Sequence, residues 1–232
     1  MSRLGEKCLA SWKKYCPDYK IVRWDESSYD VSKNVYMKQA YDAGKWGFVP
    51  DYARLDIIYR CGGIYLDTDV ELVRPLDDLL GFRCFVGIEE NDKVALGLGF
   101  GAEKGNGLLS DMMKEYEDRS FLRPDGTPDL TPSPVIQSAF FSKNGFTGCA
   151  DTPVEFRGCT VFPKRFFNPT DMNSGRIDVT PDTFSIHHYA ASWETPVNRF
   201  RGKVYQTLYR SFGEGFAEGA RRVFGKRTGK KK

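Results

Sequence analysis

The stretch GGIYLDTDVELVRPLDDLL, residues 62–80, decides the fold of this chain. Two glycines precede the short apolar run Ile64–Leu66, and the triplet Asp67-Thr68-Asp69 follows it directly. A short apolar run bounded by turn residues is typical of a buried strand. We therefore expect a strand of an open α/β sheet that ends at the two aspartates. Ligands bind such sheets outside the carboxyl ends of their strands, so a site is expected here.

Asp67 and Asp69 have a spacing that favours a bound cation. Successive side chains of a strand alternate between its faces, so the two aspartates should share one face, with Cα atoms roughly 6–7 Å apart. Carboxylates this close repel each other unless a proton or a cation intervenes. Oxygen ligands favour Mg²⁺, Mn²⁺ or Ca²⁺ over zinc. One aspartate could hold the metal directly, while the other holds it through water or accepts hydrogen bonds from a sugar; the alternative is two solvated acids.

Residues 50–61, PDYARLDIIYRC, predict a helix ahead of this strand. A proline suits the first helical turn, and the glycine pair that follows supplies the stop. Asp51 and Arg54 are three residues apart and are therefore neighbours on one face of the helix. They form either a surface ion pair that contributes little to stability or a pair that binds a sugar. In the second case Asp51 accepts hydrogen bonds from hydroxyls and Arg54 donates to hydroxyls or phosphate.

Three segments resemble a known family. Residues 48–80, FVPDYARLDIIYRCGGIYLDTDVELVRPLDDLL, closely resemble the core of the DXD-containing sugar transferases of glycosyltransferase family 32. That family includes capsular-polysaccharide and lipopolysaccharide sugar transferases and a fungal mannosyltransferase, and the catalytic core of the large glucosylating toxins is similar to it. Residues 8–26 resemble the early helix–strand unit of the family, and residues 184–193 resemble its closing motif.

The resemblance implies an α/β domain of the GT-A type, which is a Rossmann-like mixed sheet flanked by helices. It also implies a nucleoside diphosphate sugar as donor, Mn²⁺ or Mg²⁺ as cofactor, and retention of anomeric configuration. Asp69 would bind the metal with Asp67 beside it, and these two residues would carry catalysis together with Arg54. The implied donor contacts are Asp51, Arg54, Tyr65 and Asp67, with Gln137, near the start of a further predicted helix, as an additional candidate.

The segment FSIHHYAASW, residues 184–193, contains both histidines of the chain. The resemblance implies that a residue here completes the metal shell. His188 is the first choice and His187 the alternative, because a neutral imidazole is an acceptable ligand of Mn²⁺. The resemblance also implies that Ser192 and Trp193 contact the donor diphosphate, Trp193 through its indole N–H. The alternative is a tryptophan packed in the core and a histidine that caps the strand.

Members of the family begin with an apolar strand that carries part of the nucleotide-base pocket. This sequence starts at MSRLGEKCLASWKKY, immediately after the position of that strand. We therefore expect the usual first strand to be missing here, which would expose a strand edge. The predicted domains are a GT-A transferase domain over residues 1–198 and a basic, aromatic helix and tail over residues 199–232.

The composition is that of a globular protein with one domain. A chain of 232 residues with 41% apolar content can bury one substantial core. No run approaches the roughly 20 apolar residues of a membrane span, and no signal peptide is visible. The six cysteines form no C-x-x-C pair, so neither a zinc site nor a disulfide scaffold is indicated. These features favour a cytoplasmic protein, with the inner face of the membrane as its place of association.

The net charge of +3 is unevenly distributed. Residues 199–232 carry 11 Lys or Arg and 2 Glu, whereas the remainder is net acidic. The apolar residues Val204, Leu208, Phe212 and Phe216 recur every four positions, as in an amphipathic helix. A basic amphipathic helix can lie on an anionic membrane surface, where lipid-linked acceptors are built. One alternative is that this helix packs on the domain. The other is that it binds nucleic acid, which we do not expect.

The function expected from these features is transfer of a hexose from a nucleoside diphosphate sugar to a hydroxyl of a glycan or lipid-linked glycan, as in the biosynthesis of polysaccharides such as capsules. A bound metal would neutralise charge on the leaving diphosphate. Two alternatives stay open. A degenerate transferase would act as a binding protein without catalysis. The string IYLDTDVE also resembles the opening of haloacid-dehalogenase-type phosphatases, whose first aspartate is a nucleophile.

Overall fold

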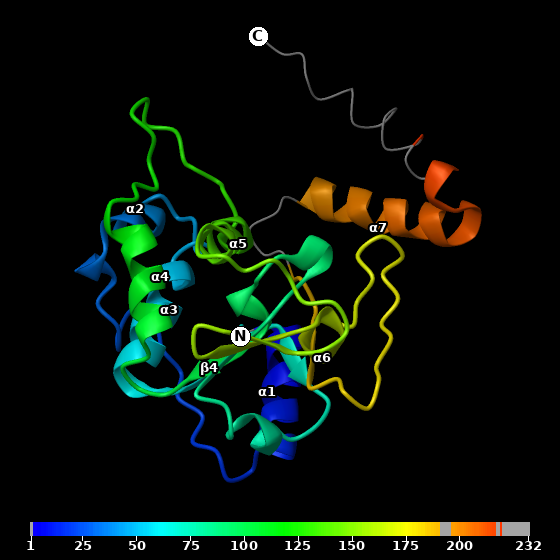
Figure 1. The fold of residues 1–232 in the computed structure, drawn as a ribbon. Coiled ribbons are helices and arrows are strands. Elements are labelled where there is room, and N and C mark those ends of the chain that lie inside the picture. Colours follow the sequence, from blue (N-terminus) through cyan, green and yellow to red (C-terminus); the bar gives the residue numbers. More distant parts are fainter. Residues whose placement is uncertain (1, 191–195, 217–218, 220–232) are drawn as a thin grey trace. The chain divides into compact units, whose positions relative to one another are not determined.

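The computed structural model describes residues 2–190, 196–216 and 219, which fold as a mixed α/β protein (Figure 1). Two compact units are distinguished. The first comprises the described residues up to Pro169 together with Val179–Tyr189, and the second comprises Thr170–Asp178 and the described residues from Ala190 onward. The predicted division after residue 198 stays a prediction.

A five-stranded sheet forms the centre of the first unit. Its spatial order is β1-β4-β3-β6-β5, and its strands are β1 (Gly63–Tyr65), β3 (Cys84–Gly87), β4 (Phe100–Ala102), β5 (Val154–Phe156) and β6 (Cys159–Phe162). β3 and β6 run parallel, and the other neighbours run antiparallel. The predicted mixed sheet is therefore confirmed. Among the described strands, β1 lies at one edge and leads directly to the two aspartates.

The side chains of β3 alternate between two apolar cores. Cys84 and Val86 pack into the larger core, and Phe85 packs into the smaller core, as the two-residue period of a strand requires. Helices cover both cores. Three of the helices over the larger core, α2, α3 and α4, lie next to one another in Figure 1. The larger core is covered by α2 (Val35–Asp42), α3 (Pro50–Cys61), α4 (Gly107–Glu117) and α5 (Ser133–Lys143), and the smaller by α1 (Arg3–Tyr15) and α6 (Lys164–Phe167).

A separate two-stranded sheet joins the D-x-D segment to the closing motif. β2 (Val70–Leu72) pairs antiparallel with β7 (Ser185–His187), so that Val70 lies opposite His187. Helix α1 holds β2 in place, because the Nε1 of Trp12 donates to the Val70 carbonyl at 2.7 Å. This pairing sets two segments that are far apart in the sequence side by side.

The helix predicted over residues 50–61 is confirmed, since it coincides with α3. Its end is set by Gly62, whose N–H donates to the carbonyl of Ile58 at 2.8 Å. The φ of Gly62 is +71°, a left-handed conformation that glycine adopts without steric cost. The glycine pair therefore turns the chain from α3 into β1.

The helix–strand unit expected over residues 8–26 is formed only in part. Its helix is the end of α1, but the residues after it up to 26 belong to none of the described strands, and Ile21 and Val22 are 40% and 51% exposed. An extended segment becomes a strand only beside a partner backbone. Residues 96–98 form a short 3-10 helix, η4 (Leu96–Leu98), ahead of β4. Further 3-10 turns are η1 (Val31–Lys33), η2 (Asp77–Leu79) and η3 (Glu90–Asp92).

The second unit contains α7 (Pro196–Phe212) and the segment 170–178. The Nε2 of Gln206, on α7, donates to the carbonyl of Met172 at 3.3 Å. The helix ends at Gly213, whose φ is +79°, so Phe216 of the predicted four-residue pattern lies beyond it. Among the described helices, none combines the length and the apolar character that a membrane crossing requires.

Candidate metal centre

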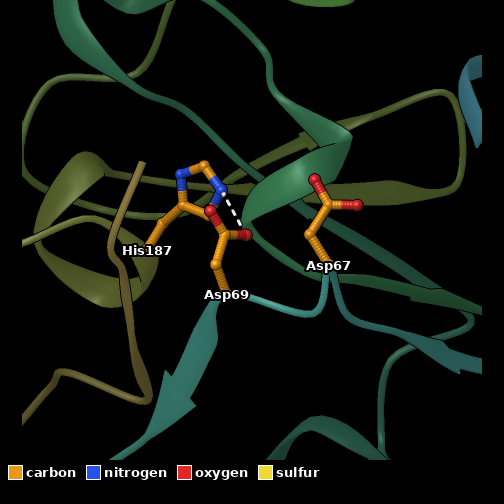
Figure 2. Close-up of side chains that lie close together, drawn as sticks. All are labelled: Asp67, Asp69 and His187. Carbon is orange, nitrogen blue, oxygen red and sulfur yellow. Dashed lines mark ion pairs between the residues drawn. The ribbon is translucent and has the colours of Figure 1, made fainter. Parts of the chain in front are cut away.

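Asp67 and Asp69 lie on the turn between β1 and β2, and not on one strand as predicted. β1 ends at Tyr65, and the N–H of Val70 donates to the carbonyl of Asp67 at 3.0 Å, which closes the turn. Both carboxylates nevertheless extend to the same side of the chain (Figure 2). The turn, rather than the alternation of a strand, therefore brings the two acids together.

The third member of the group is His187, at the end of β7 (Figure 2). Its Nε2 lies 3.2 Å from the Oδ1 of Asp69. One possible ligand atom from each of Asp67, Asp69 and His187 lies within 4.8 Å of the others. Opposite ligands of an octahedral cation with bonds of about 2.1 Å are about 4.2 Å apart, so small side-chain shifts would close this group around a cation. Two carboxylates and an imidazole also suit Mn²⁺, so the residues present fit a divalent cation.

His188, the first choice from the sequence, has another partner. Its Nε2 lies 2.7 Å from the Oε2 of Glu71, which also accepts a hydrogen bond from Lys7 at 2.6 Å. Successive side chains at a strand end point to opposite sides, so only one of the two histidines can face the aspartates. The structure therefore brings His187, the alternative candidate, to the aspartates and sets His188 beside Glu71.

The electrostatics of His187 reflect this arrangement. Burial disfavours its charged form, but the hydrogen bond and the negative charge of Asp69 outweigh burial and raise the pKa of the imidazole. Asp67 and Glu89 act in the same direction. A proton and a cation compete for the same imidazole nitrogen, so binding of a cation here would displace a proton.

Arg54 connects helix α3 to the D-x-D turn. Its Nη2 donates to the Oδ1 of Asp51 at 2.8 Å, and its Nη1 lies 3.7 Å from the Oδ2 of Asp67. Asp51 and Arg54 are only 2% and 3% exposed, which rules out the surface ion pair considered from the sequence. The guanidinium thus bridges two carboxylates inside the protein.

Burial shapes the charges of this bridge. It raises the pKa of Asp51 to about 6, against the opposing effects of Arg54 and of hydrogen bonds from Ser133 and Tyr36. Burial also works against the charge of Arg54, but the neighbouring Asp67 outweighs it, so the pKa of the guanidinium is raised. Arg54 therefore stays charged. No pattern in the sequence pointed to the support that Ser133 and Tyr36 give to Asp51.

Asp67 is enclosed by three neighbours. The hydroxyl of Tyr65 donates to its Oδ1 at 2.6 Å, and Arg54 faces its Oδ2. The third neighbour is η4, which passes so close that a Cβ at Gly97 would lie 2.6 Å from the Oδ2 of Asp67. Sequence reasoning missed Gly97, although the glycine-rich string LGLGFG was the available sign of a close backbone approach.

Gln137, on α5, supports the η4 segment. Its Oε1 accepts a hydrogen bond from the N–H of Leu96 at 3.0 Å, and the residue is 1% exposed. Its Nε2 is buried without a hydrogen-bond partner among the described residues. A water or a ligand commonly satisfies such a group. Ser192 and Trp193, the remaining predicted donor contacts, lie outside the described residues.

A known family matches the part of the chain that carries most of this geometry. Residues 3–86 match the family described as "Glycosyltransferase sugar-binding region containing DXD motif". We call residues 3–86 the DXD region. The resemblance to glycosyltransferase family 32 is thereby confirmed. The DXD region includes Asp51, Arg54, Asp67 and Asp69, whereas His187 lies beyond it.

One curated relative is similar to part of the chain. Inositol phosphoceramide mannosyltransferase 3 of Schizosaccharomyces pombe is 39% identical over 74 residues, which are 30% of this chain and 21% of that protein. The chain thus matches about a fifth of the length of this relative. No solved structure matches the chain.

Proposed function

We propose that this protein is a metal-dependent glycosyltransferase of the GT-A type, which moves a hexose from a nucleoside diphosphate sugar to an acceptor hydroxyl with retention of configuration. The observation that carries the proposal is the position of Asp67, Asp69 and His187, whose ligand atoms lie within 4.8 Å of one another. Beside them lies the buried, charged Arg54. The family match and this site point to the same chemistry.

The cation supplies positive charge to the leaving diphosphate when it is bound. Asp69 and His187 would hold it, and Mn²⁺ or Mg²⁺ suits the donor set. Asp67 would be a further ligand or would accept hydrogen bonds from the donor. Its orientation is held by Tyr65 and Arg54.

Asp51 and Gln137 would act from within the protein. The carboxylate of Asp51 is engaged by Arg54 and accepts from Tyr36 at 3.4 Å, so we assign it to holding Arg54 rather than to gripping a sugar directly. The unpartnered Nε2 of Gln137 is free to donate to the bound donor. Contacts of Ser192 and Trp193 with the diphosphate rest on the family resemblance.

A lipid-borne acceptor is favoured over a free glycan. The curated relative is named a mannosyltransferase of inositol phosphoceramide, and inositol phosphoceramide is a lipid. In the second unit, α7 (orange in Figure 1) has Val197, Phe200 and Phe212 exposed at 58%, 68% and 65%. Its charged residues are all basic, with no Asp or Glu between residues 196 and 212. Apolar side chains on a basic helix favour contact with an anionic membrane, where such acceptors lie.

Hydrolysis of nucleotide sugars tests the transfer chemistry. The purified protein is incubated with Mn²⁺ and a panel of nucleoside diphosphate hexoses that includes mannose, glucose and galactose, and the anomer released is read by NMR. We expect turnover of at least one donor with the configuration retained, and loss of turnover in Asp69→Asn. Absence of turnover with every donor would favour the degenerate binding protein. Release of phosphate from an aryl phosphate with Mg²⁺ would favour the phosphatase alternative.

Vesicle sedimentation tests the membrane contact. We expect the protein to sediment with vesicles that contain phosphatidylserine, and less so with phosphatidylcholine alone or at high salt. The double variant Phe200→Ser, Phe212→Ser should lose this binding. Leu80→Ser is the matched control, because Leu80 is 61% exposed in the first unit. Equal sedimentation of all three proteins would contradict the assignment of α7 as the contact.

A further inference from the structure

Tyr189 packs against the histidine of the candidate metal centre. The ring centroids of Tyr189 and His187 lie 4.2 Å apart, with the rings 74° from parallel. At the far end of the tyrosine ring, the hydroxyl donates to the Oε2 of Glu89 at 3.3 Å and accepts from the Nδ2 of Asn168 at 2.7 Å. Two partners therefore fix the hydroxyl while the body of the ring contacts the imidazole.

The backbone conformation of Tyr189 is unusual, which indicates that its surroundings hold the residue in this position. Its φ is +45°, a left-handed conformation that is sterically unfavourable for a residue other than glycine. Such conformations persist where the surroundings determine them strongly, and they are concentrated at functional sites. Here the surroundings are the partners of the hydroxyl, of which Asn168 is completely buried.

Glu89 comes from the end of the central strand. It follows Ile88, just beyond β3, at the edge of the sheet where ligands of open α/β sheets bind. Burial raises the pKa of its carboxyl group, and the hydrogen bond from Tyr189 opposes this effect. The family match ends at residue 86, so it covers neither Glu89 nor Tyr189.

His187 lacks the support that a metal-binding histidine usually has. Such a histidine normally donates its second ring N–H to a carboxylate, carbonyl or water, which fixes the ring. The Nε2 of His187 faces Asp69, but its Nδ1 is buried without a hydrogen-bond partner among the described residues. The T-shaped contact with the Tyr189 ring lies against this imidazole, where it opposes rotation of the ring.

We propose that Tyr189, held by Glu89 and Asn168, is a positioning residue that keeps the imidazole of His187 turned toward Asp69 and so sets the affinity of the centre for a divalent cation. The inference rests on the proposed function, because it assumes that His187 is a ligand. Tyr189 itself acts through His187, and Glu89 acts through the hydroxyl of Tyr189.

The test is the affinity for Mn²⁺ alone, measured by electron paramagnetic resonance of the free ion without any donor sugar. Tyr189→Phe keeps the ring and removes the pinned hydroxyl, and Glu89→Ala removes its acceptor. We expect both variants to raise the Kd for Mn²⁺ by about 10-fold or more, as loss of outer partners does at other metal sites. Glu89→Gln keeps an oxygen that can accept from the hydroxyl, and it should restore most of the affinity.

Tyr29→Phe is the matched control, because the buried hydroxyl of Tyr29 donates to Asp56 at 2.7 Å, away from this centre. It should bind Mn²⁺ like the wild type. If Tyr189→Phe and Glu89→Ala also bind like the wild type, the positioning role is wrong while the metal assignment stands. If the wild type itself binds no Mn²⁺, the metal centre and this inference fail together. Thermal unfolding in EDTA shows which variants are folded. If only one of Tyr189→Phe and Glu89→Ala is folded, its Kd for Mn²⁺ alone is compared with that of the wild type.

Discussion

The Nε2 of His187 lies 3.2 Å from the Oδ1 of Asp69 because of the register of two short strands. β2 and β7 pair so that His187 is opposite Val70, the residue directly after Asp69. Just beyond that pair, the N–H of His188 donates to the carbonyl of Asp69 at 3.1 Å. Backbone hydrogen bonds thus decide which histidine meets the carboxylates.

The first prediction separates the two histidines. His187→Ala should weaken binding of Mn²⁺ by at least about 10-fold, because it removes one of three potential ligands. His188→Ala should leave the affinity within about threefold of the wild type, since His188 pairs with Glu71 instead. Calorimetric titration of each variant with Mn²⁺ gives both values. A larger loss in His188→Ala than in His187→Ala would show that the register does not choose the ligand.

The second prediction concerns the bridge made by Arg54. In Arg54→Lys, a single ammonium cannot reach both Asp51 and Asp67 in the way the guanidinium does. We expect kcat/KM for nucleotide-sugar turnover to fall by about 100-fold, comparable with loss of one well-placed donor in an active site. Arg60→Lys is the control on the same helix, because Arg60 pairs with Asp56 at 2.9 Å. Equal kinetics in both variants would remove Arg54 from the active site.

The third prediction concerns the close approach of η4 to Asp67. Gly97→Ala would place a Cβ 2.6 Å from the Oδ2 of Asp67, so either the carboxylate or the loop must move. We expect Mn²⁺ affinity and turnover to fall by about 10-fold or more. Gly107→Ala is the control, since nothing lies within 4 Å of a Cβ at Gly107 on α4. Turnover of Gly97→Ala at the wild-type level would mean that the position of Asp67 is not critical.

The fourth prediction follows from the raised pKa of Asp51. Because its pKa rises from 3.8 to about 6 on folding, the native state holds the proton more tightly than the unfolded state. The contribution of Asp51 to the free energy of unfolding is therefore greatest below about pH 4 and is lost as the pH rises through about 6. The difference in unfolding free energy between wild type and Asp51→Asn should fall over this range by on the order of 2–3 kcal/mol.

Urea unfolding at several pH values, in EDTA, measures this difference. Asp25→Asn gives a contrasting control. Asp25 is partly exposed, and hydrogen bonds from Ser27 lower its pKa, so its contribution to stability should instead grow as the pH rises. A difference between wild type and Asp51→Asn that rises with pH would mean that Arg54 outweighs burial in the environment of Asp51.

Local patterns predicted a good part of the fold. The proline, the helical spacing and the glycine pair around residues 50–61 predicted α3 with the bounds it has, because these signals act within one turn of the chain. The strand of the helix–strand unit expected over residues 8–26 did not form, because a strand also needs a neighbouring backbone, which no pattern within one turn of the chain provides.

For the candidate site, too, local patterns predicted one part and the tertiary structure decided the other. By itself, the sequence determined the acidic pair, the Asp51–Arg54 spacing and the family of the DXD region, because each is carried by residues close together in the chain. The tertiary structure alone decided that Asp67 and Asp69 meet on a turn and that His187 joins them. These outcomes depend on the pairing of β2 with β7 and on burial, which arise from contacts between distant segments and leave no local pattern in the sequence.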